Sequence, residues 1–392
     1  MCPDYKPNTV AKWRQHLSAV CLAVFLLAVP TGANGQAQIP ADSVNKPSEL
    51  NVWSSNGPNA VVLSVAVDPT NRNIIYAGGT AATGSLYKSI NNGASWNLSN
   101  TGLEKVYARE LNIDPANPNT IYAQFSGGVS KSTNGGASWN RVFTTTEFTT
   151  SLKIAPSNPN TLYVAGIDFF YVSEDGGNNW QMRPLPFPNT AGSGTLAVHP
   201  LMPNVILAHI VDYGAGGGIL KSLDGGSSWG WAFVFGPADC YAIEFDSANP
   251  NIIYAGGSSS SARQSEGVYK STDGGMNWSF FSISKSTTNI IRALAIDPVN
   301  AANLYAGTDD GGVYKSNDGG RKWKAFNSGL TNLSVSELAF DLSGRFLHAA
   351  TEAGVFSVRV REDSPTSASA TISGTIADGT GASPENPYNY RK

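Results

Sequence analysis

Three polar side chains stand at one recurring place in the sequence and could bind an anion. Arg109, Tyr241 and Arg292 each lie five residues before an aspartate that opens a repeated turn. Guanidinium groups bind carboxylates and sulfates through paired N–H donors, so this set predicts an anionic ligand. The arginines could instead pair with nearby carboxylates, Glu110 and Glu337 among them, and that alternative stays open.

Aromatic side chains form a second candidate set. They are Phe169 in GIDFFY, Tyr213 in HIVDYGAGGG and Trp231 in GWAFVFG. Exposed rings of this kind stack on sugars or cover a peptide, which predicts a glycan or protein ligand. The alternation in WAFVF is equally typical of an ordinary strand that buries one side.

Two carboxylates form the third set. Asp309 in AGTDDGGVYKS and Glu352 in ATEAGVF fall at corresponding places in two repeats, and Asp168 falls there in another. An inverting glycosidase needs two carboxyl groups roughly 6.5 to 9.5 Å apart, so Asp309 and Glu352 are the alternative catalytic pair. No phosphate-binding GxxxxGK[ST] loop or supported GxSxG elbow accompanies them. We therefore expect no catalytic residue, no cofactor and no metal site.

These candidates are spread over a repeat. Six copies of one eight-residue turn occur, and their tryptophans follow one another at intervals of 41–49 residues. The residues at positions one, three, five and eight of the copies are Ser89, Asn91, Gly93 and Trp96; Ser132, Asn134, Gly136 and Trp139; Ser173, Asp175, Gly177 and Trp180; Ser222, Asp224, Gly226 and Trp229; Ser271, Asp273, Gly275 and Trp278; and Ser316, Asp318, Gly320 and Trp323.

Each repeat also contains an apolar alternation, an IIYAG-type segment and a GVYKS-type segment. Four short strands in 40 to 50 residues are typical of a β-propeller blade. The last repeat lacks its fourth strand, and NVWSSNGP near Trp53 resembles the missing segment. The sequence thus predicts an all-β fold, a seven-bladed propeller of four-stranded antiparallel blades, in which the N-terminal strand closes the last blade.

The turn itself resembles the Asp-box, or bacterial neuraminidase repeat, of sialidases, tandem-propeller xyloglucanases, sortilin and photosystem II assembly factors. The TDxGG segment around Asp309 is similar to one that carries a catalytic aspartate in the xyloglucanases. The RIP segment of sialidases is absent. Because Asn91 and Asn134 keep an acceptor oxygen but lose the charge, we expect the boxes to be structural and not metal sites. Ligands should then bind on the opposite face, where loop lengths vary.

The chain ends differ from the repeats. Residues 1–35 have the layout of a signal peptide, 36–50 read as a linker, 51–361 as the propeller, and 362–392 as a flexible tail or truncated second module. A net charge of −3 gives no electrostatic case for nucleic acid. We expect a secreted or periplasmic protein, monomeric and without a membrane span once the signal is removed. Its expected function is non-catalytic binding of a protein or glycan partner, with a glycoside hydrolase as the alternative.

Overall fold

A computed structural model of the 392-residue chain describes residues 49–80, 86–103, 107–166, 169–185, 190–212, 216–235, 239–257, 267–284 and 290–362. The predicted signal peptide and nearly all of the predicted linker and tail lie outside these ranges. The strands of the described ranges form seven four-stranded antiparallel sheets. In this described part, no helix is long and apolar enough to cross a membrane.

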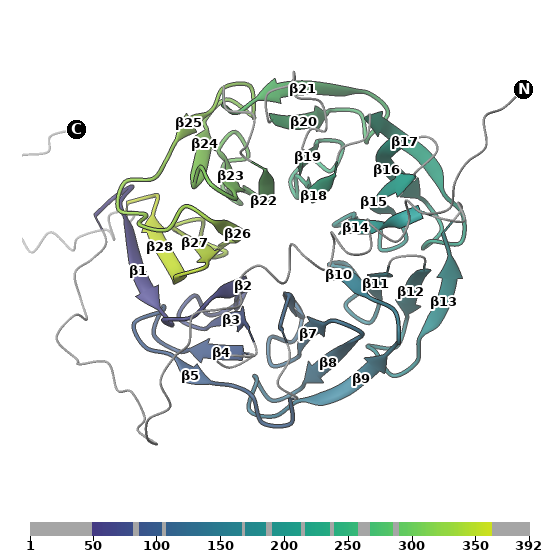
Figure 1. Ribbon diagram of the computed structural model, residues 1–392, viewed down its shortest axis with the longest axis horizontal. Helices are drawn as coiled ribbons and strands as arrows, with labels where there is room; N and C mark the ends of the chain where they lie inside the picture. The colour runs from purple at the N-terminus through teal and green to yellow at the C-terminus, as the bar shows by residue number, and fades with distance from the viewer. Residues whose placement is uncertain are drawn as a thin grey trace, which may run out of the picture. The chain divides into compact units, whose positions relative to one another are not determined.

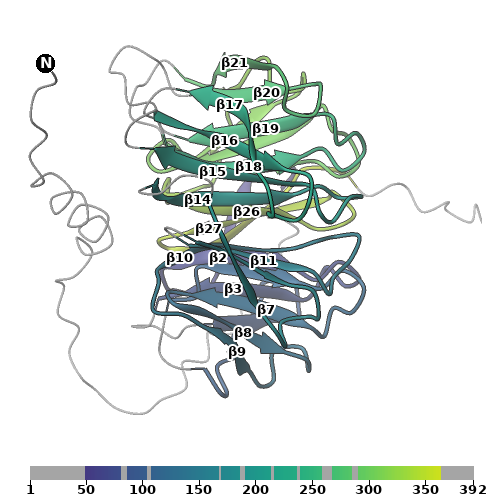
Figure 2. The ribbon, with the colours of Figure 1, turned by 90° about the vertical axis from the view of Figure 1, so that its right-hand side faces the viewer.

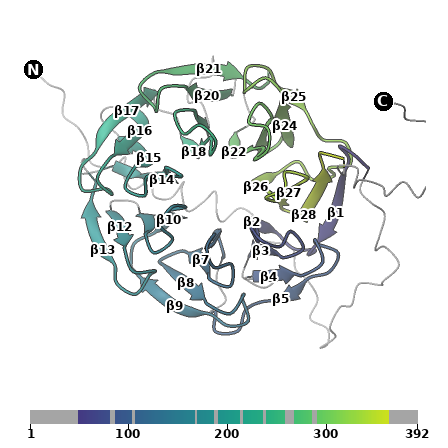
Figure 3. The same ribbon diagram turned by 180° about the vertical axis from the view of Figure 1, so that it is seen from behind.

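The sheets are arranged as blades around a common axis, with the first strand of each repeat innermost (Figure 1; seen from behind in Figure 3). We number the blades in chain order. Blades 1 to 3 contain β2 (Val62–Val67), β3 (Ile75–Gly79), β4 (Leu86–Ser89) and β5 (Asn97–Leu98); β6 (Glu110–Ile113), β7 (Ile121–Phe125), β8 (Gly128–Ser132) and β9 (Asn140–Thr144); and β10 (Thr149–Ile154), β11 (Leu162–Gly166), β12 (Phe169–Ser173) and β13 (Gln181–Pro184).

Blades 4 to 6 contain β14 (Thr190–Val198), β15 (Ile206–Asp212), β16 (Gly216–Ser222) and β17 (Gly230–Phe235); β18 (Cys240–Phe245), β19 (Ile253–Gly257), β20 (Gly267–Ser271) and β21 (Trp278–Ser282); and β22 (Ile291–Ile296), β23 (Leu304–Thr308), β24 (Val313–Ser316) and β25 (Lys324–Ala325). Blade 7 contains β26 (Val335–Phe340), β27 (Phe346–Thr351), β28 (Gly354–Arg359) and β1 (Trp53–Gly57).

Blade 7 confirms the predicted closure. Strand β1 pairs with β28 in an antiparallel register that sets Trp53 opposite Val358. Trp53 is buried, and its indole N–H donates to the carbonyl of Phe326 at 2.7 Å, at the end of blade 6. The two ends of the propeller are thereby joined by main-chain hydrogen bonds. Strand β1 supplies the fourth strand of the last blade, so β28 is not left as an unpaired edge.

Each Asp-box is a closed turn. The serine Oγ accepts from the amide of the fifth residue at 2.7–2.9 Å, and that residue is always a glycine with φ of 82–94°. The side-chain oxygen at position three accepts from the amide of position seven at 2.8–2.9 Å, whether it belongs to Asp or to Asn91 and Asn134. The geometry supports the structural role expected of these turns, because an acceptor is common to all six and a charge is not.

The boxes also join neighbouring turns and blades. In all six, the amide of the fourth residue donates to the turn between the first two strands of its own blade at 2.8–3.0 Å, so both turns share one face. Between blades 2 and 3, Tyr122 and Lys131 donate to the carbonyl of Gly176 at 2.9 and 2.8 Å. The apolar core likewise lies between adjacent blades: Tyr122 and Val129 of blade 2 pack in one cluster with Leu152 and Leu162 of blade 3. The ends of the strands thus form two faces (Figure 2), the Asp-box face and the opposite loop face.

Candidate functional site

Four polar side chains meet on the loop face where blades 5 and 6 adjoin. We call Asp239, Tyr241, Arg292 and Asp309 the loop-face cluster. Arg292 donates from Nε to Asp309 Oδ1 at 2.6 Å and from Nη2 to Oδ2 at 2.9 Å, a two-point ion pair. Its guanidinium also lies over the Tyr241 ring, 4.2 Å from the centroid, and Tyr241 donates to Asp239 at 3.1 Å.

Local backbone irregularities place these groups. The register of β18 against β19 shifts around Tyr241, and that of β22 against β23 shifts around Arg292. A bulge of this kind re-aims a side chain at the end of a strand. Asp309 lies in the turn after β23, where the buried Thr308 hydroxyl donates to Gly312 O at 2.9 Å. The cluster therefore rests on ordered strand ends.

The electrostatics of the cluster keep its partners together. Burial, reinforced by the charge of Asp239, raises the pKa of Tyr241 to about 12, so the phenol stays protonated at neutral pH. Burial opposes the charge of Arg292, yet the hydrogen bonds and charge of Asp309 raise its pKa above the ordinary value. Both oxygens of Asp309 are engaged by one guanidinium. A carboxylate held in this way positions the guanidinium that it binds. A catalytic acid needs a carboxyl oxygen that is free to reach the sugar oxygen it protonates, and Asp309 has none free of Arg292.

Arg109, the repeat equivalent of Arg292, lies elsewhere in the ring. It precedes β6 in blade 2, and its guanidinium lies 5.0 Å from the centroid of the Phe148 ring. Blades 2 and 6 lie across the axis from each other (Figure 1). The two predicted arginines therefore lie in different blades, and of the two only Arg292 contacts Tyr241. The carboxylate partner of Arg292 is Asp309, not the Glu110 or Glu337 considered from the sequence.

The remaining predicted residues are scattered. Glu352 is exposed in the turn between β27 and β28 of blade 7, where Thr351 donates to Gly354 O at 2.8 Å as Thr308 does in blade 6. Phe169 is half-buried at the start of β12. Tyr213 and Asp168 lie outside the described residues.

Trp231 differs from the expectation that it lies on the loop face. It is the second residue of β17 and lines a hollow beside Gly274 and Gly275, two residues of the Asp-box turn of blade 5. The reason is the strand direction: β17 starts directly after the box tryptophan Trp229, so its first residues lie at the box end of blade 4.

A set of charges around the axis was missed as a site. We call Glu110, Lys153, Glu244 and Glu337 the axial cluster; they lie on the innermost strands β6, β10, β18 and β26. Lys153 forms an ion pair with Glu110. Glu110 also accepts from the amide of Leu152 at 2.7 Å, and Glu337 accepts from the amide of Val65 at 2.8 Å, each in the next blade. The signal was a charged residue inside otherwise apolar first strands, such as VSELAF and CYAIEF.

Burial is the largest cause of the pKa shifts of the two glutamates Glu244 and Glu337. It raises the pKa of Glu244 to about 7 and that of Glu337 to about 8, and the charge of Glu110 adds to both. Burial works against the charge of Lys153, but the charges of Glu110, Glu244 and Glu337 together raise its pKa. In the described part of the chain, no group of three or more His, Cys, Asp or Glu side chains is placed to hold a metal ion.

Comparison with solved structures finds the same architecture in several proteins. The GH74 xyloglucanase of Xanthomonas campestris matches with a TM-score of 0.61 at 17% identity, over 80% of this chain and 54% of that one. The GH74 enzyme of Niastella koreensis matches with 0.63 at 18%, again over 80% and 54%. The chain therefore spans about half the length of these enzymes.

YCF48 from Cyanidioschyzon merolae matches with a TM-score of 0.61 at 13% identity, over 79% of this chain and 99% of YCF48. YCF48 bound to D1 peptide matches with 0.60 at 15%, over 81% and 96%. No protein-family model and no curated protein matches the sequence. At these identities the likeness concerns the fold: the chain is a seven-bladed β-propeller that matches the propellers of GH74 xyloglucanases and of YCF48.

Proposed function

We propose that the protein is an exported, secreted or periplasmic, non-catalytic propeller that binds a protein partner through its loop face. The observation that carries the proposal is the two-point ion pair between Arg292 and Asp309, which occupies both oxygens of the best candidate for a catalytic acid. Tyr241 and Arg292 form a half-buried aromatic and cationic surface beside it, and such residues anchor protein interfaces.

The comparison with YCF48 supports the same function. Nearly all of YCF48 corresponds to this chain, whereas only about half of each GH74 enzyme does. One of the YCF48 structures holds a D1 peptide. A single propeller that binds a peptide is therefore the simpler analogue, although fold likeness alone does not determine function.

The repeat offers a matched pair of variants to test this proposal. Arg292→Ala removes the guanidinium of the loop-face cluster, and Arg109→Ala removes its repeat equivalent in blade 2. Binding is measured on an array of acidic and neutral decapeptides with labelled protein. We expect Arg292→Ala to weaken the bound signal by about tenfold or more, as for an interface anchor, with Arg109→Ala close to wild type. Equal signals from wild type and Arg292→Ala would contradict loop-face binding at this cluster.

A glycoside hydrolase is the second candidate, favoured by the GH74 likeness and by the position of Asp309 in the turn after β23. Purified protein is incubated with xyloglucan, other β-glucans and sialosides, and reducing sugar is measured. We expect no release above the buffer blank. Release that Asp309→Asn abolishes would replace the binding function with catalysis.

A further inference from the structure

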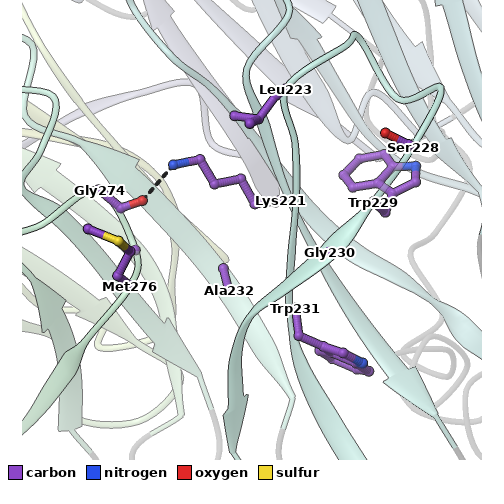
Figure 4. Close-up of a pocket in the computed structure, with 10 residues that line it drawn as sticks. Lys221, Leu223, Ser228, Trp229, Gly230, Trp231, Ala232, Gly274 and Met276 are labelled. Carbon is purple, nitrogen blue, oxygen red and sulfur yellow. Dashed lines mark hydrogen bonds between the residues drawn. The ribbon is translucent and has the colours of Figure 1, made fainter.

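A hollow on the Asp-box face lies between blades 4 and 5, away from the loop-face cluster. Its volume is about 560 Å³, within the range of ligand pockets. Lys221, Leu223, Trp229 and Trp231 of blade 4 line one side, and Met276 of blade 5 lines the other (Figure 4). We call this hollow the box groove.

Large apolar side chains stand exposed around it. Leu223 is 69% exposed, Met276 75% and Trp231 39%. Leu201 and Met202 are also exposed, at 68% and 49%, in the turn whose Asn204 carbonyl accepts from Gly225 of the same box at 2.9 Å. Large apolar side chains exposed at the edge of a hollow, as Leu223, Trp231 and Met276 are, are typical of interaction sites on soluble proteins.

One residue type opens the groove. The residue after the box tryptophan is Asn97, Asn140, Gln181, Ser279 or Lys324 in five repeats, but it is glycine, Gly230, in blade 4. A Cβ placed on Gly230 would meet no atom within 4 Å. The space that a polar side chain covers in the other repeats is thus left empty here.

The charge at the rim indicates the kind of partner. Asp224 and Asp273 belong to the two boxes that flank the groove, and hydrogen bonds, led by those from Ser228 and Asn277, lower the pKa of each to about 2. Both are therefore ionised at neutral pH. Lys221 supplies the single positive charge among the lining residues, and its ammonium donates to Gly274 O at 2.7 Å. The rim therefore favours a cation.

We propose that the box groove binds a peptide segment of a partner protein, one with a large apolar side chain flanked by lysine or arginine. Leucine and methionine walls adapt to an apolar side chain. A sugar would need acceptors for its hydroxyls, whereas Asp224 and Asp273 already accept from Ser228 and Asn277 at 2.5–2.8 Å. This surface lies at the opposite end of the blades from the loop-face cluster and does not depend on the function proposed for that cluster.

The test uses the full chain and three labelled hexapeptides, followed by fluorescence anisotropy at low salt. Two have a central Phe-Leu pair, flanked by lysines in one and by glutamates in the other; the third has lysines around two alanines. We expect only the lysine-flanked Phe-Leu peptide to bind measurably. Gly230→Gln, which copies Gln181 of blade 3, should weaken its binding by about tenfold or more without changing the melting temperature.

Controls separate the alternatives. Leu342→Ser removes an equally exposed apolar side chain, 68% exposed, from blade 7 and should bind as wild type does. Arg292→Ala should also bind normally, even if the loop face proves inactive. Equal binding by Gly230→Gln, or by the glutamate or alanine peptide, would overturn the proposal. So would displacement of the peptide by a xyloglucan oligosaccharide, or a dimer in sedimentation that Gly230→Gln dissociates, because the occupant would then be a glycan or a second copy.

Discussion

The pKa values of carboxyl groups are shifted in opposite directions in the Asp-boxes and in the axial cluster. The exposed Asp224 accepts from the hydroxyl and amide of Ser228, at 2.5 and 2.8 Å, and these bonds lower its pKa to about 2. Glu337 also accepts an amide hydrogen, from Val65, but burial raises its pKa to about 8. In the Asp-box, hydrogen-bond donors stabilise the charged carboxylate; in the axial cluster, desolvation destabilises it.

The two regions also differ in how they recur. The box appears six times with one geometry, so it is part of how every blade is built. The axial charges occur on four of the seven inner strands, while β2, β14 and β22 carry alanine, serine or threonine at the matching places. The feature found in every complete repeat is therefore part of the scaffold, whereas the charges found in only some repeats are specific to this propeller.

The largest expected effect is in the axial cluster. Lys153→Met would leave Glu110, whose side chain is 13% exposed, without its cation and near two other glutamates. We expect the free energy of unfolding to fall by about 2–3 kcal/mol, as when one partner of a buried pair is removed. Urea unfolding followed by tryptophan fluorescence measures it. The double variant Lys153→Met/Glu110→Gln should recover most of the loss; if it does not, the ion pair is not the cause.

A box variant should cost somewhat less. Ser132 is 1% exposed, and its Oγ accepts from Gly136 N and donates to Asn134 Oδ1, both at 2.9 Å. Ser132→Ala leaves the buried amide without an acceptor, which should lower the free energy of unfolding by about 1–2 kcal/mol. The exposed Ser227→Ala is the control and should change it by less than about 0.5 kcal/mol. Equal effects in the two variants would show that the hydrogen bonds of Ser132 Oγ do not stabilise the turn.

The axial cluster should make stability fall with rising pH. The folded pKa of Glu337 lies near 8, above its ordinary value of 4.5, so ionisation favours the unfolded chain as pH rises from about 5 to 8. Glu337→Gln keeps an acceptor for Val65 but cannot ionise. We expect its melting temperature to fall less than that of wild type between pH 5 and about 9. Parallel curves for the two proteins would contradict a raised pKa.

The boxes should show the reverse dependence, with the smallest effect. The folded pKa of Asp224, near 2, lies below its ordinary 3.8, so its contribution is complete above about pH 4 and is lost as pH falls toward 2. Asp224→Asn, which copies Asn134 of blade 2, should match wild type at pH 7 and lose less stability in acid. Thermal melts from pH 2 to 5 measure this. A large loss at pH 7 would mean that the charge, and not the acceptor, holds the turn.

Much of the fold was predictable because its signals are local. Serine, an Asp or Asn acceptor, glycine and tryptophan close each box within eight residues, and their spacing counts the blades. The closing role of Trp53 followed from the strand missing at the other end. The candidate site was predicted less well. Arg109 and Arg292 occupy equivalent positions in their repeats, but their blades lie on opposite sides of the propeller axis. Trp231 lies at the Asp-box end of its blade, not at the loop-face end that was expected.

By itself the sequence determined the all-β class, the seven blades and the closure by the N-terminal strand. The class and the blade count follow from signals within one repeat, which each repeat restates, whereas the closure follows from the strand missing in the last repeat. Only the tertiary structure decided that Arg292 holds Asp309, that Lys153 meets three glutamates, and that Gly230 opens a groove between two boxes. Those contacts join different strands and blades, and the distances between them are set by how the blades pack around the axis.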